Sequence, residues 1–201
     1  MDQVLSDRHT PGMDVLLETD RLVLRWFTPD DADDLVALDA DPAVMRFING
    51  GSATPRDEIV DDVLPALVAS RQRADGYGYW AAVERDTGRF VGWFHLRPGR
   101  DAGPDEPELG YRLRRDAWGR GYAAEGSRAL VDHAFADLGA SRVYAEAMAV
   151  HTASRRVMEK SGLRYVRTFH ADWPVRIDGD EHGDVEYAIT REEWEAARGE
   201  Q

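Results

Sequence analysis

A strand that leads through two closely spaced glycines into a long amphipathic helix restricts the fold of this chain more than any other feature. The residues from Leu109 to Leu113 have the pattern of a strand, and beyond Gly119 and Gly121 apolar residues recur at helical spacing up to Gly139. The N–H groups at the start of a helix lack intrahelical acceptors, and glycine lets an anion approach the main chain closely. The segment predicts an α/β fold in which the two glycines form either a diphosphate site at this helix or a simple turn.

Two common phosphate-binding patterns do not fit the segment. A Rossmann loop needs a third glycine where Ala124 stands, and it should follow the first strand of the fold, not the fourth. The Gly-Lys-Ser/Thr of a P-loop is absent from the chain. A nucleotide-binding protein that uses the same glycines remains an alternative.

The rest of the chain alternates between strand and helix patterns. The Thr28-Pro29 and Thr54-Pro55 pairs each place a capping hydroxyl before a proline and predict helix starts. Strands are expected at 21–27, 77–84, 89–97, 109–113, 142–150, 163–172 and 183–190, with further helices after 121, around 157 and from 190. The pattern predicts a flexible leader at 1–16 and one α/β domain at 17–201 around a central sheet.

Composition excludes several classes of protein and site. The chain has 38 acidic and 25 basic residues, a formal charge of −13, which argues against binding to nucleic acid and favours cationic partners. No apolar run is long enough to span a membrane, and the N-terminus lacks the pattern of a secretion signal, so a cytoplasmic location is expected. There is no cysteine, and the histidines lack zinc-ligand spacing, so no metal is expected.

Three blocks of sequence, in order, carry a resemblance to a known family. They are Glu18 to Arg25, Trp118 to Glu125, and Ala153 to Leu163. Across nearly all of 18–194 the chain resembles the GNAT superfamily of N-acetyltransferases, and within it the branch that acetylates ribosomal-protein N-termini. The resemblance implies a mixed, largely antiparallel seven-stranded sheet flanked by helices, in which the fourth and fifth strands splay apart.

The resemblance also implies acetyl-CoA as the acyl donor. Its pantetheine arm would enter the gap between the splayed strands and pair with the main chain near Leu113 and Arg114. The pyrophosphate would be held by main-chain amides of the loop, namely those of Trp118, Gly119, Arg120, Gly121, Tyr122 and Ala123. Two positions depart from the family pattern: Trp118 stands where Gln or Arg is usual, and His151 stands where an Asn usually contacts the pantetheine arm.

Acetyl transfer needs a neutral amine and stabilisation of the departing thiolate. Many relatives supply a Tyr where this chain has Met158, which cannot donate a proton, and the ribosomal branch implies that Ser154 serves the sulfur atom instead. The alternative for Ser154 is a hydroxyl that caps the first turn of its helix. Because Tyr144, Glu146 and Met148 alternate onto one face of a strand, Glu146 is the candidate general base.

The position of the base stays open between several residues. Glu146 could instead be a solvent-facing or ion-paired carboxylate, and His170 and Asp172 on the following strand are competitors. We expect acetyl transfer to a primary amine by direct attack in a ternary complex. The acceptor would be a protein N-terminus or a small cationic amine such as an aminoglycoside, and dimeric relatives suggest a homodimer by analogy.

Two further alternatives concern the reaction itself. The donor could carry a larger acyl group, as in succinyl-CoA, if a Lys or Arg faces the acyl end. The chain could also be a non-catalytic acyl-CoA sensor or interaction domain, since it has neither a Tyr at Met158 nor an Asn at His151.

Overall fold

A single eight-stranded sheet forms the centre of the computed structural model, which describes residues 14–73, 75–99, 102–103, 105–171 and 175–199. The strand order is β1-β2-β3-β4-β5-β6-β8-β7, and every pair is antiparallel except β5 with β6. The strands are β1 (Val15–Glu18), β2 (Leu22–Trp26), β3 (Gly78–Glu84), β4 (Phe90–Pro98), β5 (Pro107–Leu113), β6 (Arg142–Met148), β7 (Arg164–Phe169) and β8 (Asp184–Thr190). The fold class is confirmed, but the prediction of seven strands is wrong by one.

The additional strand is β1, which the sequence pattern did not reveal. Val15, Leu16 and Leu17 are consecutive apolar residues without period-two alternation, and the pairing with β2 shifts register between Val15 and Leu17. A bulge of this kind hides a strand from periodicity. Residues 15 and 16 therefore belong to the sheet and not to the predicted leader, whose residues 1–13 lie outside the described ranges.

Seven helices are described: α1 (Ala32–Asp39), α2 (Pro42–Asn49), α3 (Arg56–Glu58), α4 (Leu64–Ala69), α5 (Tyr122–Ala136), α6 (Thr152–Lys160) and α7 (Arg191–Gly199). None of the helices in the described ranges is long and apolar enough to cross a membrane. The start at Thr28-Pro29 is confirmed, because the Thr28 N–H donates to the Asp31 carboxylate at 2.8 Å before α1 begins.

Helix α2 was not predicted, although its signals resemble those of α1. The Asp41 side chain accepts a hydrogen bond from the Ala43 N–H at 2.9 Å, Pro42 occupies the first helical position, and Gly50 ends the helix with φ of +80°. This helix matters because its side chains line the cavity described below.

The helix expected from Glu58 to about Ala74 is broken into short pieces. A π-helical turn at Ile59–Val63 separates α3 from α4, and a 3₁₀ turn at Ser70–Gln72 follows α4. The cause of the π turn is Pro65, which lacks an N–H and whose ring would clash with the carbonyl four residues earlier, so the backbone widens locally. The Leu64 N–H accordingly bonds to Ile59 O, five residues back.

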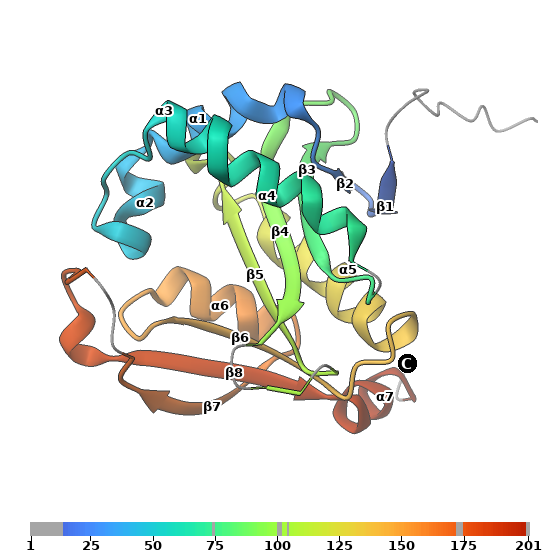
Figure 1. The fold of residues 1–201 in the computed structure, drawn as a ribbon. Coiled ribbons are helices and arrows are strands. Elements are labelled where there is room, and N and C mark those ends of the chain that lie inside the picture. The colour runs from blue at the N-terminus through green and yellow to red at the C-terminus, as the bar shows by residue number, and fades with distance from the viewer. Residues whose placement is uncertain (1–13, 74, 100–101, 104, 172–174, 200–201) are drawn as a thin grey trace, which may run out of the picture.

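The sheet has a different layer on each face. Helices α5 and α6 cover one face and bury a core that includes Leu109, Leu113, Leu130 and Met158. Helices α1 to α4 cover the other face beside β3, β4 and β5, around a second core (Figure 1). Along β5 and β6, odd-numbered residues therefore point to α5 and α6, and even-numbered residues point to the opposite face.

Strands β5 and β6 touch at one end only. Their parallel pairing consists of the single register pair Glu108 with Tyr144, and beyond it the strands diverge. In Figure 1, β6, β8 and β7 run across the lower half of the molecule while β4 and β5 run in a clearly different direction. The predicted splay between the fourth and fifth strands is confirmed, at what are now β5 and β6.

Candidate active site

The glycine loop between β5 and α5 presents a row of unpaired main-chain N–H groups. Gly119 and Gly121 have φ of +71° and +85°, a region that residues with a side chain rarely adopt. The first hydrogen bond of the helix runs from Glu125 N to Gly121 O at 3.0 Å, and the amides from Gly119 to Ala124 have no acceptor among the described residues. Such a loop at the start of a 15-residue helix is an anion site.

Side chains hold this loop from the side of β3. Glu84 accepts hydrogen bonds from Arg120, Tyr122, Arg89 and Thr87 at 2.8–2.9 Å. These bonds, that of Arg89 foremost, lower the pKa of Glu84 to about 2. Of the predicted cofactor residues, Arg120 and Tyr122 therefore use their side chains to fix the loop.

Arg21 fixes the same loop from its other side. Its Nη1 donates to Arg120 O at 2.9 Å and its Nε donates to Glu125 at 2.7 Å. The Tyr122 ring has the guanidinium groups of Arg21 and Arg120 at 4.7 and 4.8 Å from its centre. The sequence reasoning missed Glu84 because its partners lie up to 38 residues away, and no local pattern marks it.

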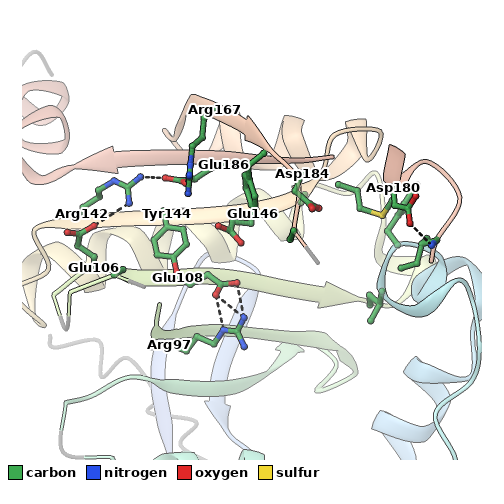
Figure 2. A pocket seen from close by; sticks show the side chains of 18 of the residues that line it. Arg97, Glu106, Glu108, Arg142, Tyr144, Glu146, Arg167, Asp180, Asp184 and Glu186 are labelled. Carbon is green, nitrogen blue, oxygen red and sulfur yellow. Dashed lines mark hydrogen bonds and ion pairs between the residues drawn. The ribbon is translucent and has the colours of Figure 1, made fainter. Parts of the chain in front are cut away.

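The splay opens onto a cavity of about 730 Å³ on the face opposite α5 and α6. Six carboxylates and three guanidinium groups line it: Glu106, Glu108, Glu146, Asp180, Asp184 and Glu186, with Arg97, Arg142 and Arg167. Figure 2 shows these side chains, which come from strands β4 to β8 and from the segments just before β5 and β8. With all of them ionised, the cavity carries an excess of negative charge.

Each guanidinium group of the cavity already has a carboxylate partner. Arg97 bonds to Glu108 at 2.8–3.0 Å, and Arg167 donates to Glu186 at 2.7 Å. Arg142 forms ion pairs with both Glu186 and Glu106. The positive charges are thus neutralised within the wall, and Asp180 pairs with Arg176, which lies outside the lining, at 2.8 Å. The negative charge that is left favours cationic ligands.

Glu146 is a carboxylate of this cavity on the part of β6 that diverges from β5. It lies two residues beyond the last β5–β6 pair, and the predicted alternation of Tyr144, Glu146 and Met148 onto one face is confirmed by the cavity lining. No described side chain forms a hydrogen bond or ion pair with it. The Glu146 side chain is exposed in the open cavity, and its partial desolvation there raises its pKa. The neighbouring carboxylates of Glu108, Glu186 and Asp184 act in the same direction, and Arg167 acts against them.

Ser154 lies on the other face of the sheet, in the first turn of α6. Its side chain is buried, and its Oγ is 2.9 Å from the hydroxyl of Tyr111 on β5, which also donates to Ser154 O at 3.1 Å. In the described structure Ser154 Oγ therefore bonds to another side chain and does not cap its helix. Sequence reasoning treated Tyr111 only as part of a strand and missed this contact.

Comparison with known proteins settles which family this arrangement belongs to. A family model described as "Acetyltransferase (GNAT) domain" matches residues 21–164. The FsC-acetyl coenzyme A-N(2)-transacetylase of Aspergillus fumigatus is 36% identical over 89% of this chain and 77% of that protein. The chain belongs to the GNAT acetyltransferase family.

Solved structures agree on the fold. An acetyltransferase of this family from Bacillus anthracis has a TM-score of 0.73 at 22% identity and covers 88% of this chain and 98% of its own. The aminoglycoside acetyltransferase AAC(6')-Ib, solved with paromomycin and acetyl-CoA, has a TM-score of 0.70 at 18% identity and covers 89% and 98%. The prediction of an acetyltransferase that uses acetyl-CoA is confirmed. The ribosomal-protein branch is not confirmed, because these matches name the family and not that branch.

The loop of this GNAT acetyltransferase fits the diphosphate of coenzyme A. The unpaired amides from Gly119 onward supply donors that do not depend on side-chain type. The space beside Gly119 is open, with no atom within 4 Å of the position that a Cβ would take. The indole of Trp118 points back to the end of β5, where its Nε1 donates to Leu113 O at 2.8 Å. Ala123 continues the row of amides in the first turn of α5.

Leu113 and Arg114, the two residues expected to pair with the pantetheine arm, differ in the direction of their main-chain groups. The Arg114 N–H already donates to Val91 O on β4 at 2.9 Å. Main-chain groups alternate in direction along an antiparallel strand, so those of Leu113 and Tyr111 face the gap beside β6. The main-chain groups of Leu113 therefore face the gap, and its carbonyl oxygen already accepts a hydrogen bond from Trp118 Nε1.

The remaining candidate residues lie around the same opening. His151 precedes α6, and its ring stacks on Phe47 of α2 with 4.1 Å between ring centres; burial, with Arg46 nearby, lowers its pKa to about 4. Its imidazole is thus neutral and packed against a residue that lines the cavity. His170 is exposed and does not line the cavity, and Asp172 lies outside the described residues. No cluster of three metal-ligating side chains occurs in the described part of the chain.

Proposed function

We propose that this acetyltransferase moves the acetyl group of acetyl-CoA to the primary amine of a small cationic acceptor, by direct attack in a ternary complex. The observation that carries the proposal is the cavity, which opens at the splayed strands and in which carboxylates outnumber guanidinium groups six to three. A cationic acceptor is attracted there, and its amine meets Glu146 where the strands part.

Glu146 is the proposed general base. A protonated amine cannot attack, and a carboxylate with a raised pKa is a better proton acceptor than an ordinary one. Ser154, on the opposite face, is the proposed donor to the departing sulfur. The amides of the glycine loop hold the diphosphate, and proximity of the two bound reactants supplies much of the rate.

The cavity also favours acetyl over a charged acyl group. Arg97, Arg142 and Arg167 are each bonded to a carboxylate, so a succinyl carboxylate would have to displace one of these pairs. Two relatives support a small acceptor: one is named as an N(2)-transacetylase, and the other was solved with paromomycin.

The test is a mass measurement on a panel of amines incubated with the protein and acetyl-CoA. The panel contains an aminoglycoside, a polyamine, a neutral primary amine, and peptides that begin with the N-terminal residues of ribosomal proteins. A gain of one acetyl group on the cationic small molecules supports the proposal, and a gain on the peptides alone would place the protein in the ribosomal branch. Acetyl-CoA binding without transfer to any amine would indicate a sensor domain. Sedimentation of the same sample checks the expected homodimer.

A further inference from the structure

We propose that Tyr111 positions Ser154, so that the serine hydroxyl hydrogen meets the sulfur atom as it leaves the acetyl group. This inference rests on the proposed function and adds a residue to it. Tyr111 acts through Ser154 and is therefore a positioning residue.

The contact joins the two elements that border the splay. Tyr111 lies on β5, three residues past the only β5–β6 pair, and Ser154 lies in the first turn of α6, 43 residues later in the chain. The phenol oxygen meets both oxygens of Ser154, at 2.9 Å for Oγ and 3.1 Å for the carbonyl. The Tyr111 ring is braced by Phe94, with 6.2 Å between ring centres. Such a two-point contact, partly buried at Tyr111 and buried at Ser154, fixes where the serine hydroxyl lies.

The hydrogen count at this contact allows two arrangements. The phenol has one hydrogen and can give it either to Ser154 O or to Ser154 Oγ. In the first arrangement the serine hydroxyl donates to the phenol oxygen. In the second the phenol donates to Oγ, and the serine hydrogen is free for a third atom. Negative charge that develops on a nearby sulfur favours the second arrangement.

The phenol stays a donor throughout the reaction. Burial raises the pKa of Tyr111 to about 12, so it keeps its proton at neutral pH. Met158 follows Ser154 by one turn of α6 and is buried in the core, and it has no hydrogen to donate. In α6, Ser154 and not Met158 therefore offers a hydrogen to the sulfur, with Tyr111 behind it.

The chemical step needs no net proton from this pair. The C–S bond breaks and its electron pair stays on sulfur, where the Ser154 hydroxyl donates a hydrogen bond. The ammonium group of the acceptor loses one proton before the attack and a second after the C–N bond has formed, each through Glu146 to solvent, and the thiolate finally takes one up from solvent. Tyr111 and Ser154 are neutral before and after the step.

The experiment compares Tyr111→Phe, Ser154→Ala and the double variant. With an amine that the wild-type protein acetylates, Tyr111→Phe should lower kcat about tenfold while KM for acetyl-CoA changes less than twofold. Because Tyr111 acts through Ser154, adding Tyr111→Phe to Ser154→Ala should cause no further loss. A purely structural role would lower kcat again in the double variant.

Tyr165→Phe is the matched control, since it removes the hydroxyl of an exposed tyrosine on β7. It should retain wild-type kcat, and thermal unfolding of all variants checks that they fold. Full kcat in Tyr111→Phe, or losses that multiply in the double variant, would overturn the assignment while acetyl transfer itself stands. If the wild-type protein binds acetyl-CoA and acetylates no amine, the proposed function is wrong, and the role of Tyr111 is overturned with it.

Discussion

Replacing Glu84 with glutamine tests whether side chains on β3 hold the glycine loop in place. The change keeps the shape of the side chain but removes the charge that Arg89 and Arg120 bind. Tyr122 loses a charged acceptor as well, at the first residue of α5. The variant should therefore be less stable than the wild-type protein and should bind acetyl-CoA more weakly.

The size of the stability loss follows from the titration of the carboxylate. Its pKa lies at about 2 in the folded protein and near 4.5 when it is free. Since a tenfold change in proton affinity corresponds to about 1.4 kcal/mol, the interactions contribute at most about 3.5 kcal/mol. The Arg89 and Arg120 side chains are 36% and 47% exposed, so water screens them, and we expect a loss of about 2 kcal/mol at pH 7.

The pH dependence gives this prediction its sign. A carboxyl group whose pKa is lowered on folding stabilises the protein fully above its unfolded pKa, and the contribution is lost as the pH falls through the folded pKa. The difference between wild type and Glu84→Gln should be constant above pH 4.5 and shrink from pH 4.5 toward pH 2. Urea unfolding at a series of pH values measures it.

A second carboxylate near the same end of the sheet serves as the control. Glu18 pairs with Arg85 at 3.4 Å, and both side chains are about half exposed. Glu18→Gln should therefore change stability by less than about 0.5 kcal/mol. A loss in Glu84→Gln as small as in this control, or a loss that stays the same down to pH 3, would refute the account of Glu84.

The other predictions concern the two faces of the splay and the loop. Glu146→Gln and Ser154→Ala should each lower kcat about a hundredfold and leave acetyl-CoA affinity nearly unchanged in calorimetry; near-normal turnover would remove the residue from the mechanism. In the wild-type protein kcat should rise with pH through the raised pKa of Glu146, and Glu146→Gln should flatten that limb of the profile. Gly119→Ala should cost about 1 kcal/mol, because its φ is +71°, and should weaken acetyl-CoA binding. Gly139→Ala, with φ of +74° and equally open space around its Cβ, should cost the same stability without affecting binding.

Local patterns in the sequence predicted the parts of the fold that local interactions determine. The hairpin between β3 and β4 follows from its Asp-x-Gly turn, and the glycine loop follows from Gly119 and Gly121. The splay came from the family resemblance and not from any local pattern. Helix α2 could have been predicted, since Asp41-Pro42 is the same kind of start as Thr28-Pro29.

The contacts that organise the site could not be predicted from the sequence. Tyr111 and Ser154 meet only because β5 and α6 are brought together by the sheet, and Glu84 reaches Tyr122 across 38 residues. Likewise, Glu146 could be placed on a strand face by its alternation. That this face is a cavity with an excess of carboxylates depends on five strands and a helix, several of which are distant in sequence.

The positions of Glu146 and Ser154 on opposite faces of the sheet have a consequence for traffic through the enzyme. In the proposed mechanism the acceptor enters and its acetylated form leaves on one side, while coenzyme A comes and goes on the other, so neither would block the exit of its partner. An inhibitor that joined an amine to coenzyme A through one covalent tether would have to thread the slit between β5 and β6, and its tether would need to be as narrow as a single extended chain.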